Sequence, residues 1–190
     1  MGTALITRSE YKAYVGITSP NSDAVIDAII PKVSELVKTY CRRTFVDYIS
    51  DSITETTHAG YGPNITLKEY PLLSVTTVAF SEDYGQTYTD LVEYTDYVVD
   101  YNDATIIAIS GDFPQYLNGY QITYTAGYEV IPDDLKLAVM DLVTYYIKND
   151  MAVHSPKAPG TNSVQVEYIT TSAFPAHIRR VLDMYKASWD

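Results

Sequence analysis

Two helical patterns enclose one long β-rich stretch in this 190-residue chain, and that order most constrains the fold. In Ser22–Phe45 and again in Asp133–Asn149, apolar residues recur every three or four positions, which is typical of a helix with one buried face. The stretch between them is rich in Tyr, Thr, Val and Ile, which favour strands. We therefore predict an α+β fold with a helical core domain, residues 1–45 and 129–190, and a β-rich insertion, residues 46–128.

The helical core is predicted to be a bundle of two long helices with shorter helices near the N- and C-terminal ends. Ser9–Val15 has the pattern of a short helix closed by Gly16, and Pro175 begins the last helix. Pro31 is expected to kink or restart the first long helix, because proline cannot donate a backbone hydrogen bond. The apolar stripes of the two long helices are Val25, Ile26, Ile29, Ile30, Val33, Val37, Tyr40 and Cys41, and Leu135, Ala138, Val139, Leu142, Val143, Tyr146 and Ile147.

Seven short strand patterns follow one another within the insertion, separated by turn residues such as Gly, Asn and Asp. Short strands at this spacing favour a small β-sandwich or barrel-like unit. Beyond the second long helix, Met151–Asn162 has the composition of a loop and Val164–Ile169 alternates like one more strand. The strands predicted in the insertion are Ile53–His58, Ile65–Leu67, Val75–Ser81, Thr87–Val92, Tyr97–Asp100, Thr105–Ala108 and Tyr120–Thr125.

Composition excludes several classes of partner. No apolar run approaches the roughly 20 residues that cross a bilayer, and no signal peptide is evident, so no membrane is expected among the partners. The single Cys41 cannot form an internal disulfide, which favours a cytoplasmic setting. The formal net charge of −11 disfavours tight binding of phosphate groups. It remains compatible with a protein past which DNA moves without adhering, because carboxylates repel phosphates.

No catalytic, cofactor-binding or metal-binding constellation is predicted. His58, His154 and His177 lie far apart without ligand spacing, and Cys41 lies on an apolar helix stripe, where a buried, inert thiol is expected. A group of acids is the nearest approach to an active site, but these residues sit mostly at predicted turns, where aspartate is common. We therefore interpret as a solvated rim the residues Glu82, Asp83, Asp90, Glu93, Asp96, Asp100 and Asp103.

Aromatic residues indicate two kinds of contact surface. The chain has 19 tyrosines, most of which are expected on ordinary sheet faces. One alternative function is a carbohydrate-binding β module that stacks sugars on Tyr84, Tyr88, Tyr94 and Tyr97. The last helix carries the basic and aromatic residues Arg179, Arg180, Tyr185, Lys186 and Trp189, of the types that anchor interfaces. They are either a partner-binding surface or a helix that packs through its apolar side and leaves its arginines solvated.

Four segments in one order resemble a known family, the head–tail connector or adaptor proteins of tailed double-stranded DNA bacteriophages. The likeness covers about residues 5–150 and begins with a short helix and a long helix that ends in Tyr-Cys-Arg-Arg-Thr-Phe. It continues with a Ser-Val-Thr-Thr-Val strand, and then with a Tyr-Thr-Ala-Gly-Tyr turn and a helix that follows proline. The four segments are LITRSEYKAYVGI, NSDAVIDAIIPKVSELVKTYCRRTF, YPLLSVTTV and YQITYTAGYEVIPDDLKLAVMDLVTYYI.

The resemblance implies a structural protein of the virion neck that is assembled in the host cytoplasm and is not an enzyme. It implies a ring, usually of twelve copies, that docks beneath the portal protein and joins the DNA-filled capsid to the tail. The expected partners are therefore the portal protein, a tail-side neck protein and further copies of this chain, while genomic DNA passes through the channel without specific binding. The alternative within phage structure is another neck or tail-completion protein, such as a stopper or a tail terminator.

Overall fold

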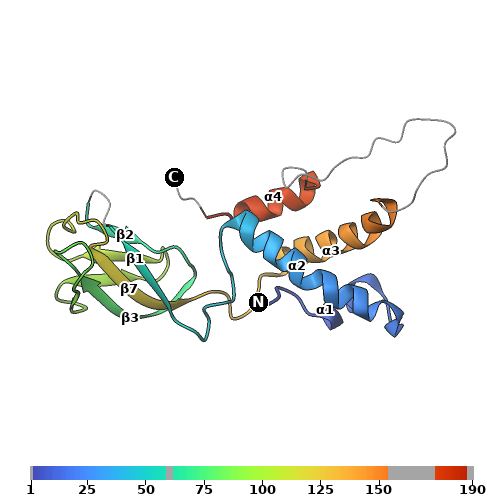
Figure 1. Cartoon of the computed structure of the whole chain (residues 1–190), viewed down its shortest axis with the longest axis horizontal. Helices are drawn as coiled ribbons and strands as arrows, with labels where there is room; N and C mark the ends of the chain where they lie inside the picture. The colour runs from blue at the N-terminus through green and yellow to red at the C-terminus, as the bar shows by residue number, and fades with distance from the viewer. Residues whose placement is uncertain (1, 59–61, 154–173, 188–190) are drawn as a thin grey trace. The chain divides into compact units, whose positions relative to one another are not determined.

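The computed structural model describes residues 2–58, 62–153 and 174–187 and has an α+β fold, which confirms the predicted class (Figure 1). The chain divides into two compact units. Unit 1 consists of Met1–Arg43 and Ile131–Asp190, and unit 2 consists of Thr44–Val130. Unit 1 carries all the helices of the described residues and unit 2 carries all the strands. The predicted division into a helical core domain, residues 1–45 and 129–190, and a β-rich insertion, residues 46–128, stays a prediction.

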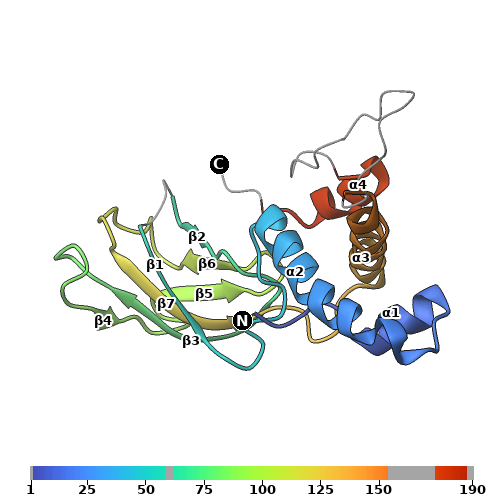
Figure 2. The same cartoon turned by 45° about the vertical axis from the view of Figure 1, so that its right-hand side comes forward.

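Unit 1 is built on two long helices that pack against each other, α2 (Asp23–Cys41) and α3 (Asp133–Val153). The short helix α1 (Arg8–Val15) contacts α2, and α4 (Ala176–Met184) contacts both long helices (Figures 1 and 2). A single 3₁₀ turn, η1 (Pro20–Ser22), leads into α2. Four helices therefore share one apolar interior.

The predicted apolar stripes supply that interior. In α2 the residues at less than one-tenth exposure include Ile26, Ile30, Val33, Val37 and Cys41, which recur at helical spacing on one face. The matching face of α3 comprises Leu135, Ala138, Val139, Leu142 and Val143. Val25, which the sequence also places on the stripe, is instead half exposed.

The helix boundaries differ from the prediction in four places. The last helix, predicted to carry Tyr185 and Lys186, ends at Met184. Pro31 does not restart α2, which runs unbroken from Asp23 to Cys41, because proline removes one hydrogen bond while the buried residues on both sides keep the segment packed. The helix also ends before Phe45, since Arg42 takes a left-handed conformation with φ of 55°. In contrast, α3 extends beyond Asn149 to Val153. The predicted strand Val164–Ile169 lies outside the described residues.

Side chains at the start of α1 attach this helix to α3. Thr7 is the N-cap, and a capping box joins its side chain to the backbone N–H of Glu10 and the Glu10 side chain to the backbone N–H of Thr7. The same Glu10 carboxylate accepts a hydrogen bond from Lys136 Nζ at 2.7 Å. Tyr11 and Tyr14 add bonds from their hydroxyls to Thr144 and Asp141 of α3, at 3.1 and 2.7 Å.

Glu10 is expected to make part of the stability of unit 1 dependent on pH. The bond from Lys136, followed by the bonds from Thr7, lowers the pKa of Glu10 from 4.5 to about 2, although partial burial acts in the opposite direction. Since the folded-state pKa is the lower one, the carboxylate stabilises the fold fully above pH 4.5 and loses this effect as the pH falls towards 2. Glu10→Gln should cost at most about 1 kcal/mol at neutral pH, because the group is partly exposed. Urea unfolding of both proteins across pH measures the difference, and a gap that stays constant down to pH 2 would contradict this origin.

Unit 2 contains two antiparallel sheets. The four-stranded sheet has the order β1-β7-β3-β4, and the three-stranded sheet has the order β2-β6-β5. No hydrogen-bonded strand pair joins the two sheets within the described residues. The sheets therefore do not close into a barrel, and the prediction of a barrel-like unit is wrong. The strands are β1 (Ile53–Thr57), β2 (Asn64–Thr66), β3 (Leu72–Phe80), β4 (Thr89–Asp90), β5 (Tyr97–Asp100), β6 (Thr105–Ala108) and β7 (Tyr120–Ala126).

The core of unit 2 lies between the two sheets. Along β7 buried and half-buried residues alternate, so that Tyr120, Ile122, Tyr124 and Ala126 all point into the core. Ile106 of β6 joins them in one continuous apolar cluster with residues of both sheets. Tyr97, Tyr120 and Tyr124 therefore serve packing, while the prediction that most tyrosines do so stays a prediction.

A clasp closes unit 2 where the chain enters and leaves it; we use this name for residues 44–49 together with 126–128. Phe45 is fully buried and stacks on Tyr128, and the backbone N–H of Tyr128 donates to the Phe45 carbonyl at 2.7 Å. Gly127 has a φ of +126°, and a Cβ atom added there would lie 2.5 Å from the same carbonyl oxygen. Only glycine fits this close approach between the two segments.

Two buried carboxylates fix the clasp to the sheet. Both oxygens of Glu69 accept from the backbone N–H of Thr44 at 3.2 Å. The Tyr124 hydroxyl accepts from the Glu69 backbone N–H at 3.2 Å and donates to Glu55 at 3.0 Å. Glu55 points inward from the edge strand β1, and its second oxygen lies 3.4 Å from Lys68 Nζ. An inward charge of this kind makes an edge strand a poor template for unwanted pairing.

Candidate interaction surfaces

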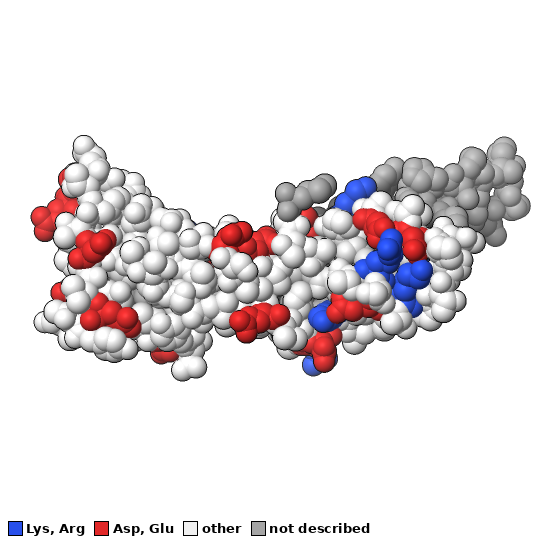
Figure 3. Space-filling model, turned by 90° about the horizontal axis from the view of Figure 1, so that it is seen from below, with Lys and Arg blue, Asp and Glu red and all other residues white. Residues whose placement is uncertain are grey.

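Charge is distributed unequally between the two units. Unit 2 has 13 Asp and Glu residues and one basic residue, Lys68, which gives a formal charge of −12. Unit 1 has 11 Asp and Glu residues and 12 Lys and Arg residues, which gives +1. On the face shown in Figure 3, Lys and Arg gather over unit 1, and only Asp and Glu are coloured over unit 2. Unit 2 therefore repels polyanions, whereas unit 1 can contact surfaces of either sign.

The C-terminal cluster predicted from the sequence is only partly one surface. Arg179 and Arg180 are exposed on α4, whereas Ile178 and Leu182 on its other side are buried. Tyr185 caps the helix and donates its hydroxyl to Asp134, so it contributes to packing within unit 1. Trp189 lies outside the described residues. The exposed part of the cluster that the structure describes is thus Arg179, Arg180 and Lys186, of which Lys186 lies over the ring of Tyr40.

Cys41 is a packing residue, as predicted. Its side chain is fully buried, and its Sγ lies 3.6 Å from the carbonyl oxygen of Leu182. Burial raises the pKa of the thiol to about 12, although Arg43 acts in the opposite direction. The thiolate that a nucleophile or metal ligand requires is therefore disfavoured at neutral pH.

The histidines are dispersed over the fold. His58 and His177 are exposed in different units, and His154 lies outside the described residues. His177 approaches one carboxylate, that of Asp141, at 3.7 Å. In the part of the chain that the structure describes, no three His, Cys, Asp or Glu side chains are placed to hold a metal ion.

Three of the acids predicted to form a rim stabilise their own turns. Asp83 accepts hydrogen bonds from the side chains of Ser81 and Thr87 and from nearby backbone N–H groups, and these bonds lower its pKa. Asp96 accepts from the backbone N–H of Val92 at 2.7 Å, and Asp100 accepts from that of Asn102 at 2.9 Å. Such turn-stabilising bonds explain these aspartates without any catalytic role.

The four tyrosines of the carbohydrate-binding alternative do not form one platform. Tyr97 is 5% exposed and belongs to the core between the sheets, because its strand turns that face inward. The Tyr88 hydroxyl donates to the backbone carbonyl of Asn118 at 2.9 Å, which joins two loops. Tyr84 and Tyr94 remain highly exposed, at 66% and 79%, but on separate loops. The alternative of a flat stacking surface made of all four tyrosines is therefore wrong.

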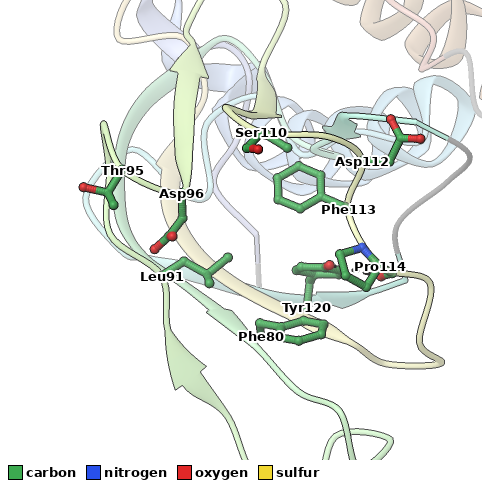
Figure 4. A pocket seen from close by; sticks show the side chains of 10 residues that line it. Phe80, Leu91, Thr95, Asp96, Ser110, Asp112, Phe113, Pro114 and Tyr120 are labelled. Carbon is green, nitrogen blue, oxygen red and sulfur yellow. Dashed lines mark hydrogen bonds between the residues drawn. The ribbon is translucent and has the colours of Figure 1, made fainter.

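Sequence reasoning missed a pocket of about 200 Å³ at one end of the sandwich (Figure 4). The rings of Phe80, Phe113 and Tyr120 and the side chain of Leu91 surround it. Ring centroids lie 5.1 Å apart for Phe80 and Tyr120 and 5.2 Å apart for Phe113 and Tyr120. No local pattern could have revealed the pocket, since its lining comes from loops and strand ends that only the folded sheets bring together.

These features describe an α+β protein with a helical unit and an acidic β unit. No helix among the described residues has the length and apolarity to span a membrane. Residues 4–188 match the family model described as "Head completion protein". The chain belongs to the head completion protein family. This membership confirms the predicted resemblance to the head–tail connector proteins of phages.

A curated relative and several solved structures agree with this assignment. The head completion protein of Escherichia phage T5 is 24% identical over 183 residues, which cover 96% of this chain and 98% of that protein. A chain in the neck of an empty GTA particle with C6 symmetry has a TM-score of 0.60 and 16% identity, covering 100% of this chain and 97% of that one. A chain in the virion of a native gene transfer agent particle has a TM-score of 0.61 and 15% identity, covering 99% and 96%. At these identities the solved structures show a shared fold.

Proposed function

We propose that this protein is a head–tail connector subunit that forms a ring beneath the portal and joins the DNA-filled capsid to the tail. The match of residues 4–188 to the head completion family carries the proposal. The proposal is also supported by the fold that this chain shares with chains in GTA necks, which were described with C6 and with C12 symmetry. A ring of twelve identical copies is compatible with both of these symmetries.

The charge distribution suggests which unit forms the contacts between copies and which unit faces DNA. Copies in a ring lie close together, and units with a formal charge of −12 would repel one another across a shared contact. Unit 1 has a formal charge of +1, so copies of it do not repel one another in this way. We therefore place the contacts between neighbouring copies on this helical unit, which forms the core of the subunit. Repeated around a channel, the acidic units would keep DNA from adhering as it passes.

The exposed arginines of α4 are the proposed portal contact. Replacing Arg179 and Arg180 together by alanine removes two interface-type side chains that are exposed on the isolated chain, so the fold should be unaffected. Attachment to purified portal rings, measured by co-sedimentation, should fall at least tenfold, which corresponds to roughly 1.4 kcal/mol. The matched control replaces Lys32 and Lys148, two exposed lysines of the same unit, and should attach normally. A well-folded double arginine variant that attaches like the wild type would end this assignment.

Trp189 is assigned to the same contact by sequence alone. If it belongs to the portal contact, Trp189→Ala should weaken attachment without changing the melting temperature. If it instead seals the helical core, the same change should lower the melting temperature by several degrees. Thermal unfolding and portal co-sedimentation of this single variant therefore distinguish the two roles.

A further inference from the structure

The pocket lies at the end of the sandwich opposite to the clasp. In the register of β3 and β7, Phe80 pairs with Tyr120 at the pocket end, and Leu72 pairs with Ala126 at the clasp end. Six residue steps along β7 separate the two ends by about 20 Å. Since the chain enters and leaves unit 2 at the clasp, neither of the segments that lead to unit 1 begins at the pocket end.

The pocket is built in advance of any ligand. The Tyr120 hydroxyl donates to the Pro114 carbonyl oxygen at 3.0 Å, which fixes a ring of the wall against the loop that supplies Phe113. In Figure 4, the rings of Phe80, Phe113 and Tyr120 and the side chain of Leu91 face a common space. That space, about 200 Å³, has room for one bulky apolar side chain rather than for a small-molecule ligand of typical size.

An exposed aromatic residue in a strained conformation directly precedes Thr95, which lines the pocket. Tyr94 is 79% exposed and has a φ of 63°, which is unusual for a bulky residue. Its loop is held by hydrogen bonds from the Tyr94 backbone N–H to the Tyr97 carbonyl and from the Ile109 backbone N–H to the Asp96 carbonyl, at 2.8 and 3.0 Å. The fold therefore holds a large ring in solvent at a cost in strain, a combination found where binding uses the residue.

Charge restricts the occupant. Asp96 and Asp112 are among the residues that line the pocket, and Lys68 is the one basic residue of unit 2. A polyanion such as DNA is repelled from this surface, and so is unit 2 of another copy. A protein segment with a bulky apolar side chain next to Lys or Arg is complementary in both shape and charge.

We propose that this pocket, together with Tyr94 next to Thr95 of its lining, binds a cationic segment of a different neck protein on the tail side, which inserts one bulky apolar side chain. The proposal rests on the connector function proposed above, in which α4 meets the portal. The portal is then the first partner of the adaptor, and the proposal assigns the contact with its second partner to the pocket end of unit 2. The apolar side chain supplies burial in the pocket, and the neighbouring cation meets the carboxylates of its lining.

Photo-crosslinking in assembled phage particles tests which chain occupies the pocket. A photoreactive phenylalanine analogue replaces Tyr94, and the matched control places it at Tyr101, which is 46% exposed and lies at the opposite end of β5. We expect position 94 to crosslink a different virion protein at a peptide that contains Lys or Arg beside an apolar residue. Crosslinks to another copy of this chain or to DNA, or equal yields from position 101, would overturn the proposal.

Variants test the contact by its effect on tail joining. Tyr94→Ala and Asp112→Lys should each reduce the number of tailed particles at least tenfold, while the copies of this chain per DNA-filled head stay at the wild-type value. Tyr101→Ala and Asp103→Lys, which change exposed residues at the other end of β5, should have no effect. Tailed particles at the wild-type level with the Tyr94 and Asp112 variants present in heads would overturn this inference alone. Absence of the wild-type chain from heads would instead overturn the connector function, and this inference with it.

Discussion

Replacing Leu142 with alanine is expected to lower the free energy of unfolding by about 2–5 kcal/mol, the range for a buried leucine whose loss leaves a cavity. Leu142 is fully buried on the face of α3 that packs in the interior of unit 1, together with Val139 and Val143. The neighbouring helices cannot close the space without moving their own buried side chains. Urea unfolding followed by the helical circular dichroism signal measures the change.

Leu137 provides the matched control for this substitution. It lies on the same helix but is 48% exposed, so Leu137→Ala removes the same atoms without creating a cavity. We expect a change within about 0.5 kcal/mol. Equal effects of the two substitutions would mean that the stripe of α3 is not the core of unit 1.

Gly127→Ala is expected to open the clasp of unit 2 and to cost about 2–4 kcal/mol. A residue with a Cβ atom is strained at a φ of +126°, and that atom would lie 2.5 Å from the Phe45 carbonyl oxygen, which is backbone and cannot rotate away. To relieve the overlap, residues 45 and 127 must separate, which lengthens the hydrogen bond between Tyr128 and Phe45. Denaturant unfolding measured by the near-ultraviolet signal of the tyrosines reports the loss.

Gly111 separates the two causes of that loss. It also has a positive φ, +71°, but an added Cβ atom would meet nothing within 4 Å. Gly111→Ala should therefore cost only the conformational strain, about 1–2 kcal/mol. If Gly111→Ala and Gly127→Ala destabilise the protein equally, the close approach in the clasp contributes nothing.

The sequence predicted most helices and strands because the spacing of apolar residues and the positions of turn residues are local features of the chain. The predicted strands Tyr97–Asp100 and Thr105–Ala108 coincide with β5 and β6, since turn residues mark their ends. Helix positions followed from the spacing of apolar residues, but helix ends did not. The left-handed conformation of Arg42, which ends α2, has no signature comparable to a glycine.

Of the candidate surfaces, the sequence placed the exposed arginines of α4 but not the pocket. Tyr94 and Tyr97 show why. They are three residues apart and chemically identical, yet one is 79% exposed and the other 5%. Tyr94 lies in the loop before β5, whereas Tyr97 begins β5, and the burial of that face of β5 depends on its pairing with β6 and on the second sheet.

By itself, then, the sequence determined the order of helices and strands, the α+β class and the family, because these depend on spacing and order along the chain. The tertiary structure decided where the acidic surface lies, how Gly127 and Phe45 meet in the clasp, and that Phe80, Leu91, Phe113 and Tyr120 surround one pocket. Each of these depends on residues that are distant in the chain and come together only through sheet register and packing.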